Sequence, residues 1–528
     1  MTALTATGTL LRLNLRRDRV LIVLSAIAFV AWTILVAQVL QSLYPTAAER
    51  AQFSHVVAES PAVRAIRGDT RGLETTGQLV AFQVGVLFST FIAVVTVLLV
   101  GRHARGDEES GRTELLLASV AGRDAPLTAG LLSALLLNVL IGVGTAAGLV
   151  VLGLPIAGAA AMGAAYAGVG LTFAGVAAVA AQLAGTARGA NTLAIGAIIA
   201  AYLLRAAGDA GNGTLSWLSP IGWSSRLRAF DHERWWVLGL FALTTVGLVL
   251  AAYALLARRD LGAGMLPQRL GRPQAGARFG SPLALALRLE RAVTVAWITG
   301  VSMLAIVYGL VTSSVADFVQ NPQVARIFTQ AGADTVVDSY FATVMLVLGL
   351  LAGGFAIQAT LRPRTEELAG RAEPVLATAT SRLRWAGAFW LIALAGVAAL
   401  LVVSGLVVGI GALISTGDAG DLVRLAGAAL AQAPAVAVLA GLAALVHGLA
   451  PRAAPFVWIA FAGCVFLGFF GELLDVPAWL RDLSPYTHVP QVPAERVEVP
   501  PLLGLSAVAA LLFAAAAGTL RRRDMVSD

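Results

Sequence analysis

One charged sequence occurs twice in this chain, each time in a polar segment that follows a long hydrophobic one. The two copies lie 259 residues apart and read Glu108-x-x-Gly111-Arg112-x-Glu114 and Glu367-x-x-Gly370-Arg371-x-Glu373. A Glu followed four residues later by Arg favours an ion pair on one face of a helix, worth about 0.2–0.5 kcal/mol. The sequence therefore predicts two short, solvated helices, each stabilised by its own ion pair.

Ion pairing within the loop does not account for every repeated position. The same offset aligns Arg105 with Arg364 and Asp107 with Glu366, and Leu-Ala follows both copies. A polar loop repeated in both halves of a membrane protein suggests contact with something outside the membrane. We therefore favour docking helices over purely structural ones. The candidate docking residues are Arg105, Asp107, Glu108, Gly111, Arg112 and Glu114, with Arg364, Glu366, Glu367, Gly370, Arg371 and Glu373.

The composition indicates an all-α, polytopic membrane protein. Of 528 residues, 58% are hydrophobic and 13% charged, and the mean hydropathy is +0.81. Hydrophobic segments of this length predict twelve transmembrane helices. Abundant Ala and Gly predict close helix packing, because small residues let helices approach in lipid. The predicted spans are 20–40, 79–100, 126–152, 157–183, 191–208, 235–257, 292–312, 340–360, 386–412, 428–450, 455–472 and 500–520.

The repeats divide the chain into two pseudo-symmetric six-helix halves. We predict a first transmembrane half at 1–257, a cytoplasmic linker at 258–291 and a second half at 292–528. The two repeated polar loops, called coupling loops below, would be 101–125 and 361–384. Each half also ends in Arg-Arg-Asp, as Arg258-Arg259-Asp260 and Arg522-Arg523-Asp524. Halves of equal orientation predict a pseudo-twofold axis along the membrane normal.

Arginine sets the predicted orientation. Arginines cluster before the first span, in both repeated loops, in the linker and at the C-terminus, so the positive-inside rule places both termini in the cytoplasm. The net charge of +7 is explained by this topology, and no basic patch interleaved with aromatic residues predicts nucleic-acid binding.

The chain contains no lysine. A phosphate-binding P-loop needs a lysine to reach the β- and γ-phosphates, so this chain cannot hold one. The single Cys464 gives no disulfide framework, and no His, Asp or Glu spacing predicts a catalytic or metal site. We expect a protein that is not itself an enzyme and binds no cofactor.

The chain resembles the permease subunits of ABC-2-type exporters, in particular the two-halved actinobacterial polyketide-antibiotic and multidrug exporters. The repeated loops, the exit from Arg258 to Gly264 and the segment Leu483-Ser484-Pro485-Tyr486 carry the resemblance. It implies coupling helices that contact two copies of an ATP-binding subunit, which would hold ATP and Mg. It also implies an elbow helix before the first span, a bacterial plasma-membrane location and export of hydrophobic or amphipathic compounds. Pro374 replaces Leu115, which predicts that the second coupling helix stops early.

The resemblance further implies a central cavity. Aromatic side chains, one Gln and one Met in the second helix of each half are candidates for its lining, although lipid-facing packing accounts for them equally well. The candidates are Phe82, Gln83, Phe88, Phe91, Phe341, Met345 and Phe355. Gln182 and His447, in other spans, are expected to form hydrogen bonds between helices.

The alternative is a proton-coupled secondary transporter of the major-facilitator type. That class also has twelve helices, a central linker and charged loops after helices 2 and 8. Proton coupling requires a titratable group at membrane depth, and no Asp or Glu lies near the centre of a predicted span. The sequence therefore favours a pump that another subunit powers.

Overall fold

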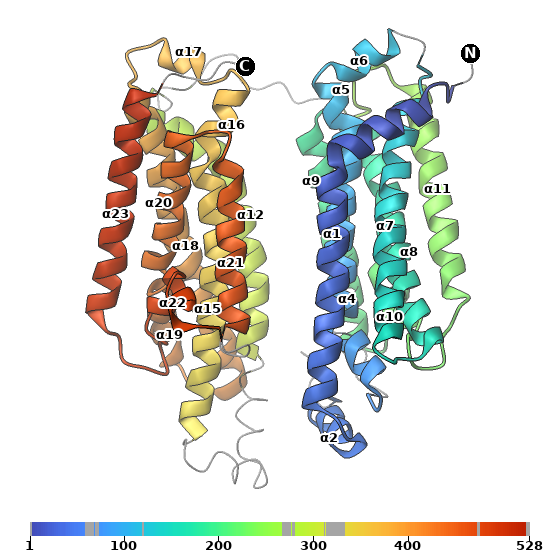
Figure 1. Cartoon of the computed structure of the whole chain (residues 1–528), viewed down its shortest axis with the longest axis horizontal. Coiled ribbons are helices and arrows are strands. Elements are labelled where there is room, and N and C mark those ends of the chain that lie inside the picture. Colours follow the sequence, from blue (N-terminus) through green and yellow to red (C-terminus); the bar gives the residue numbers. More distant parts are fainter. Residues whose placement is uncertain are drawn as a thin grey trace. The chain divides into compact units, whose positions relative to one another are not determined.

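The computed structural model describes residues 3–58, 68, 73–118, 121–266, 276, 280–310, 312, 333–471 and 476–523. These ranges contain helices joined by turns and loops, and no strand, which confirms the all-α prediction. It divides into two compact units, Met1–Gly271 and Arg272–Asp528. The division falls inside the predicted linker, much of which lies outside the described residues. Figure 1 shows each unit as a bundle of long helices.

The first unit contains six long helices, with shorter elements between them. The long helices are α1 (Thr7–Leu43), α4 (Thr76–Gly101), α7 (Ala125–Val151), α8 (Ile156–Leu183), α9 (Ala187–Ala210) and α11 (Val237–Arg258). The shorter elements are α2 (Ala47–Ala58), the π-helix η1 (Arg102–Gly106), α5 (Asp107–Glu109), α6 (Arg112–Leu117), the 3₁₀-helix η2 (Leu215–Leu218) and α10 (Pro220–Arg226).

The second unit follows a similar order. Its longer helices are α12 (Pro282–Leu310), α15 (Ala333–Thr360), α18 (Arg382–Thr416), α19 (Asp421–Leu430), α20 (Ala433–Leu449), α21 (Val457–Phe470) and α23 (Val499–Arg522). The shorter ones are α16 (Arg362–Leu368), α17 (Glu373–Leu376), η4 (Ala454–Phe456), α22 (Ala478–Arg481) and η5 (Pro485–His488). α19 and α20 together form one predicted span.

Among the described residues, eleven helices are long and apolar enough to cross a membrane. They correspond to eleven of the twelve predicted spans, often with longer ends. The exception is the predicted span 455–472, where α21 has 14 residues. At 1.5 Å per residue such a helix is about 21 Å long, shorter than the roughly 30 Å hydrocarbon core. The chain is a multi-pass membrane protein.

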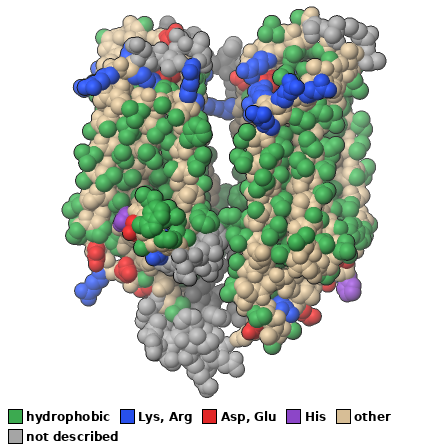
Figure 2. All heavy atoms as spheres, viewed as in Figure 1, with side chains coloured by type: hydrophobic (Ala, Val, Ile, Leu, Met, Phe, Trp, Pro, Cys, Tyr) green, Lys and Arg blue, Asp and Glu red, His purple; other side chains and the backbone are tan. Residues whose placement is uncertain are grey.

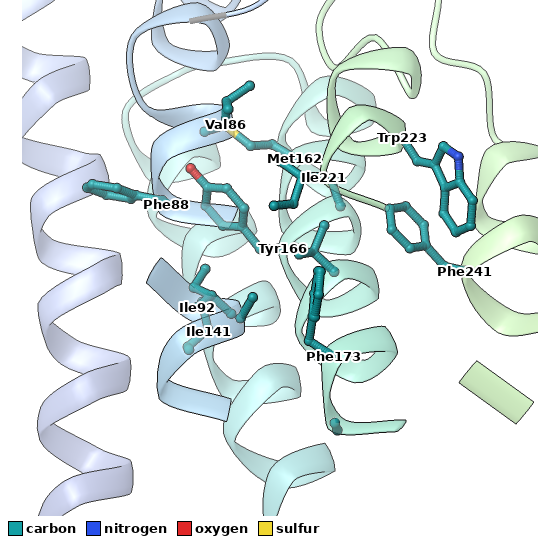
Figure 3. Packing of buried hydrophobic residues seen from close by; sticks show 14 of the residues in the cluster. Val86, Phe88, Ile92, Ile141, Met162, Tyr166, Phe173, Ile221, Trp223 and Phe241 are labelled. Atoms are coloured by element: carbon teal, nitrogen blue, oxygen red, sulfur yellow. The ribbon is translucent and has the colours of Figure 1, made fainter. Parts of the chain in front are cut away.

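Small residues bring the helices close together, as predicted. A Cβ built on Gly142 of α7 would lie 2.7 Å from the Gly163 carbonyl oxygen of α8. One on Gly163 would lie 2.2 Å from the Gly142 oxygen. Larger residues fill the remaining space in the first unit, where Tyr166 of α8 lies between Phe88 and Met162 (Figure 3). The first-unit core is therefore built by glycine contacts and interleaved aromatic rings.

Charged side chains gather at the ends of each unit. Figure 2 shows a hydrophobic band along each bundle, with arginines concentrated at the end that carries the repeated loops. The arginines at 12–19 do not form a separate elbow helix, because α1 runs without interruption from Thr7 to Leu43. Figure 1 shows that its first turns lie obliquely across this end of the unit.

Candidate coupling sites

A π-helix positions the first repeated loop. α4 continues through η1 into α5 without a break, and the π-turns widen the helix just before Glu108. Single π-turns inside α-helices are frequently found at functional sites. The chain then turns at Gly111, whose φ of +74° is accessible to glycine without steric cost. Gly370 has a φ of +66° in the second unit. The same left-handed turn therefore explains why both copies of the loop have glycine at this position.

Glu108 binds the exit of the last helix in its unit. Its two carboxylate oxygens each accept a 2.6 Å hydrogen bond from the Arg259 guanidinium, which follows α11. The backbone N–H of Gly262 donates a third bond of 2.6 Å, and Arg105 lies 3.1 Å away. The Glu108 side chain is only 3% exposed. This bidentate pair fixes the direction of both side chains.

Arg105 joins three segments of the first unit. Its guanidinium donates to the carbonyl oxygens of Gly185 at 2.7 Å, Gly262 at 2.9 Å and Ala263 at 3.1 Å. Gly185 follows α8, so Arg105 connects the loop to the end of that helix. Gly264 is also needed here, because an added Cβ would lie 2.4 Å from the Gly185 nitrogen. The repeated loop is thus bound to the ends of α8 and α11.

The second unit repeats the central contact. Glu367 accepts a 2.6 Å hydrogen bond from Arg523, and its side chain is 4% exposed. Arg364 donates to the Pro451 carbonyl oxygen at 2.7 Å, after α20. Arg523 is the second arginine of its Arg-Arg-Asp sequence, as Arg259 is in the first unit; Asp524 lies outside the described residues. Both units therefore bind the repeated Glu to the equivalent arginine.

Two further positions reinforce this correspondence. Gln182 accepts a 2.8 Å bond from the Arg259 Nε, which confirms its predicted role as an interhelical hydrogen-bond partner. His447 lies 265 residues later, and its Nε2 is 3.3 Å from a Glu367 oxygen. Arg523 donates to the His447 carbonyl oxygen at 3.0 Å. Each site therefore contains a polar residue from the end of the fourth long segment of its unit.

The predicted ion pairs within the loops are wrong. Arg112 contacts Asp107 at 3.2 Å, and Arg371 contacts Glu366 at 2.7 Å. The hydrogen bond from Arg371 to Glu366 raises the pKa of that arginine above its ordinary value. The i,i+4 spacing predicted one continuous helix, whereas the glycine turn separates the two residues.

The outward surface of the loop is made by other residues. Arg112 is 60% exposed, Leu115 is 78% exposed, and Glu114 is exposed. In the second unit Arg371 is 58% exposed and Glu373 is exposed. Glu108 and Glu367 point into their own units, so the interpretation of these two carboxylates as surface contacts is replaced by an internal one.

Pro374 shortens the second helix at its beginning. α17 ends at Leu376, the position equivalent to the end of α6, but begins two residues later. The prediction that this helix stops early is therefore wrong. Proline is accommodated in the first turn of a helix, where its missing N–H costs nothing.

Comparison with known proteins identifies the family. Residues 279–521 match the family described as Multidrug efflux system permease Rv1217c, C-terminal domain. Over 526 residues the chain is 39% identical to the Multidrug efflux system permease protein Rv1217c of Mycobacterium tuberculosis (strain ATCC 25618 / H37Rv). The match covers 98% of this chain and 95% of that protein. This chain belongs to the multidrug efflux permease family. The resemblance to ABC-type exporter permeases is confirmed.

The candidate coupling sites of this permease contain a second set of ion pairs that the sequence did not reveal. Asp18 of α1 lies 2.5 Å from the His103 Nε2 and 2.7 Å from Arg102, and its side chain is fully buried. At the position aligned with His103 the second unit has Arg362, which lies 3.7 Å from Glu290 of α12. An acidic residue on the first helix thus meets a basic residue at the end of the second in each unit. The 259-residue offset aligns the basic residues and could have identified them.

The candidate cavity residues of the permease pack mostly within their own units. Phe341, Met345 and Phe355 are fully buried in the second-unit core, and Phe82 and Phe88 are buried in the first. Gln83 is partly exposed and Phe91 is exposed. Phe82 lines a pocket within the first unit. A cavity-lining role for the set stays a prediction.

Proposed function

We propose that this chain is the transmembrane permease subunit of an ATP-driven exporter for hydrophobic or amphipathic compounds. Two copies of a separate ATP-binding subunit would bind ATP and Mg at the cytoplasmic side of a bacterial plasma membrane. Both termini of the permease would lie on that same side. Family membership supports the efflux role. The absence of lysine, and therefore of a P-loop lysine, supports an external ATPase.

One observation carries this proposal. In each unit a buried Glu of the repeated loop binds the arginine that follows the last helix, Glu108 with Arg259 and Glu367 with Arg523. A loop connected in this way moves together with the helix ends beneath it. Force applied to the loop would therefore reach several membrane helices at once, which is what alternating access requires of a device powered from outside the membrane.

The docking contacts would come from the exposed residues of the loop. Leu115 and Arg112 give α6 an apolar contact beside a positive charge, and Arg371 and Glu373 provide charges at the second loop. Large exposed apolar side chains outside the lipid are candidates for protein contacts. α17 has four residues and α6 has six, so the two subunit contacts would be unequal.

The proposal is tested by co-expressing the chain with candidate ATP-binding subunits that contain a P-loop, taken from the same genome. Cargo-stimulated ATP hydrolysis is expected from the purified complex, and the Leu115→Asp variant should lose co-purification with the ATPase. Val423→Asp is the matched control, because Val423 is 80% exposed on α19, far from the loop in sequence. Transport of cargo along a proton gradient by the reconstituted chain alone would contradict the proposal.

A further inference from the structure

A pocket of about 100 Å³ lies within the first unit, separate from the coupling site. Its walls come from α4 and the residue Leu73 before it, from α8, from the end of α10 and from the segment that follows α10. Phe82, Met162 and Tyr166 supply apolar surface, while Gln78, Arg228 and Asp231 supply polar groups. Engineered apolar cavities of about 150 Å³ bind benzene. This pocket is about two-thirds of that volume, so a benzene-sized ring would fill it and extend to its open side, where a polar group would lie.

One wall of the pocket carries an unsatisfied hydroxyl. Ser89 of α4 is completely buried, and its Oγ has no hydrogen-bond partner among the residues that the structure describes. A buried hydroxyl without a partner costs about 1–3 kcal/mol. Ser89 lines the pocket, so a bound molecule with a hydrogen-bonding group would satisfy it. This is the observation that points to a ligand.

The segment that lines the pocket at Arg228 and Ala229 is anchored by the neighbouring Phe230, which does not itself line the pocket. The ring of Phe230 lies against Gly77 of α4 and Gly158 of α8, where an added Cβ would be 2.4 and 2.1 Å from it. Arg228 and Phe230 both have left-handed backbones, with φ of +56° and +67°. Residues held in this region cost about 1–3 kcal/mol each and cluster at ligand-binding sites. The segment is thus fixed in a strained conformation beside the pocket.

The charges of the pocket favour an anionic group. Arg226 is paired with Asp209 at 3.1 Å. Arg228 has a looser partner, Asp231 at 3.8 Å, and both side chains of this pair are 33% exposed. A carboxylate of a ligand would therefore find a guanidinium that is only weakly engaged, and would gain a charge-assisted hydrogen bond.

We propose that this pocket binds a small anionic amphipath, with its aromatic group between Phe82, Met162 and Tyr166, its carboxylate at Arg228 and a hydroxyl at Ser89. The proposal rests on the proposed function in one respect, since it names a class of cargo for the exporter. The binding itself is a property of the first unit and needs no ATP-binding subunit.

The test uses the purified full-length permease alone, with 3-fluoro-4-(hydroxymethyl)benzoate as a probe observed by ¹⁹F NMR. Gly85 lines the pocket, and a Cβ added there meets no atom within 4 Å, so Gly85→Leu fills the pocket without a backbone clash. Gly247→Leu on α11 is the matched control, because a Cβ there is equally unobstructed. We expect probe affinity at least tenfold lower in Gly85→Leu and unchanged in Gly247→Leu.

Two further measurements examine the chemistry. Ser89→Ala and the neutral probe 3-fluoro-4-(hydroxymethyl)benzamide should each reduce affinity severalfold. Wild-type affinity in Gly85→Leu would overturn the site, and equal affinity for the benzamide would overturn the anionic preference. Because no ATPase is present, loss of ATP-driven transport in a separate assay leaves these results unaffected.

Discussion

Glu108 and Arg259 are 151 residues apart in the sequence and joined by two hydrogen bonds of 2.6 Å. The pair is almost completely buried, and Glu367 with Arg523 reproduces it in the second unit. Removing one member of a buried ion pair is more costly than removing both, because an uncompensated charge remains.

The first prediction concerns the stability of this pair. Arg259→Ala should destabilise the permease by about 3–5 kcal/mol, the cost of leaving a buried carboxylate unpaired. The neighbouring Arg258→Ala is the control, because Arg258 is exposed and exposed charges contribute little. Denaturant-induced unfolding in detergent measures the free energy of unfolding of both variants. The double variant Glu108→Leu/Arg259→Leu should lose less than Arg259→Ala, and a greater loss would contradict the explanation.

The second prediction applies the same comparison to the other unit. Arg523→Ala should lower stability, whereas Arg522→Ala should be neutral, since Arg522 is exposed. The effect should be smaller than for Arg259→Ala, because one oxygen of Glu367 is bonded to Arg523 and the other faces His447. Denaturant unfolding of each variant and its control gives the two losses of stability, which can then be compared. Equal stability of the Arg523 and Arg522 variants would show that the repeated arginine does not hold the second loop.

The third prediction uses the aligned positions His103 and Arg362. His103→Arg should retain stability, because the equivalent arginine already pairs with an acid in the second unit. His103→Ala should destabilise by about 1–3 kcal/mol, since the buried Asp18 loses a hydrogen-bonding partner. Thermal unfolding distinguishes the two variants. Equal losses would mean that side-chain shape, and not the contact with Asp18, determines this position.

The fourth prediction tests the glycine turns. Gly111→Ala should cost about 1–2 kcal/mol, because an L-residue at φ of +74° is strained. Gly106→Ala is the control: its φ is −65°, and the nearest atom to an added Cβ is 3.8 Å away. Denaturant unfolding should separate them, and a neutral Gly111→Ala would show that the turn relaxes.

The sequence predicted the helices better than the contacts between them. Hydrophobic length located α4, α7, α8 and α11 within a few residues, because each span needs a continuous apolar segment. α21 was located equally well, but its 14 residues make it shorter than the other spans. Long-range pairs leave a weaker signal: both Glu108 and Arg259 belong to repeated sequences, but nothing local to either shows that they meet.

The ion pairs predicted within the repeated loops are wrong for a related reason, which is that local spacing does not show where the chain turns. The i,i+4 rule assumes an unbroken helix, and Gly111 breaks it. Repetition showed that these residues matter in both halves, but it could not distinguish an outward contact from an internal one. That distinction depends on burial, which the fold supplies.

The connection between the repeated loop and the membrane helices is tested most directly by cargo-stimulated ATP hydrolysis of the assembled complex with Arg259→Lys in the permease, compared with Arg258→Lys. Lysine keeps the charge but cannot form the bidentate bond to Glu108. We expect an intact complex whose cargo stimulation falls at least severalfold in Arg259→Lys and stays at the wild-type level in Arg258→Lys. Full cargo stimulation in Arg259→Lys would contradict the claim that this bond connects the loop to the membrane helices.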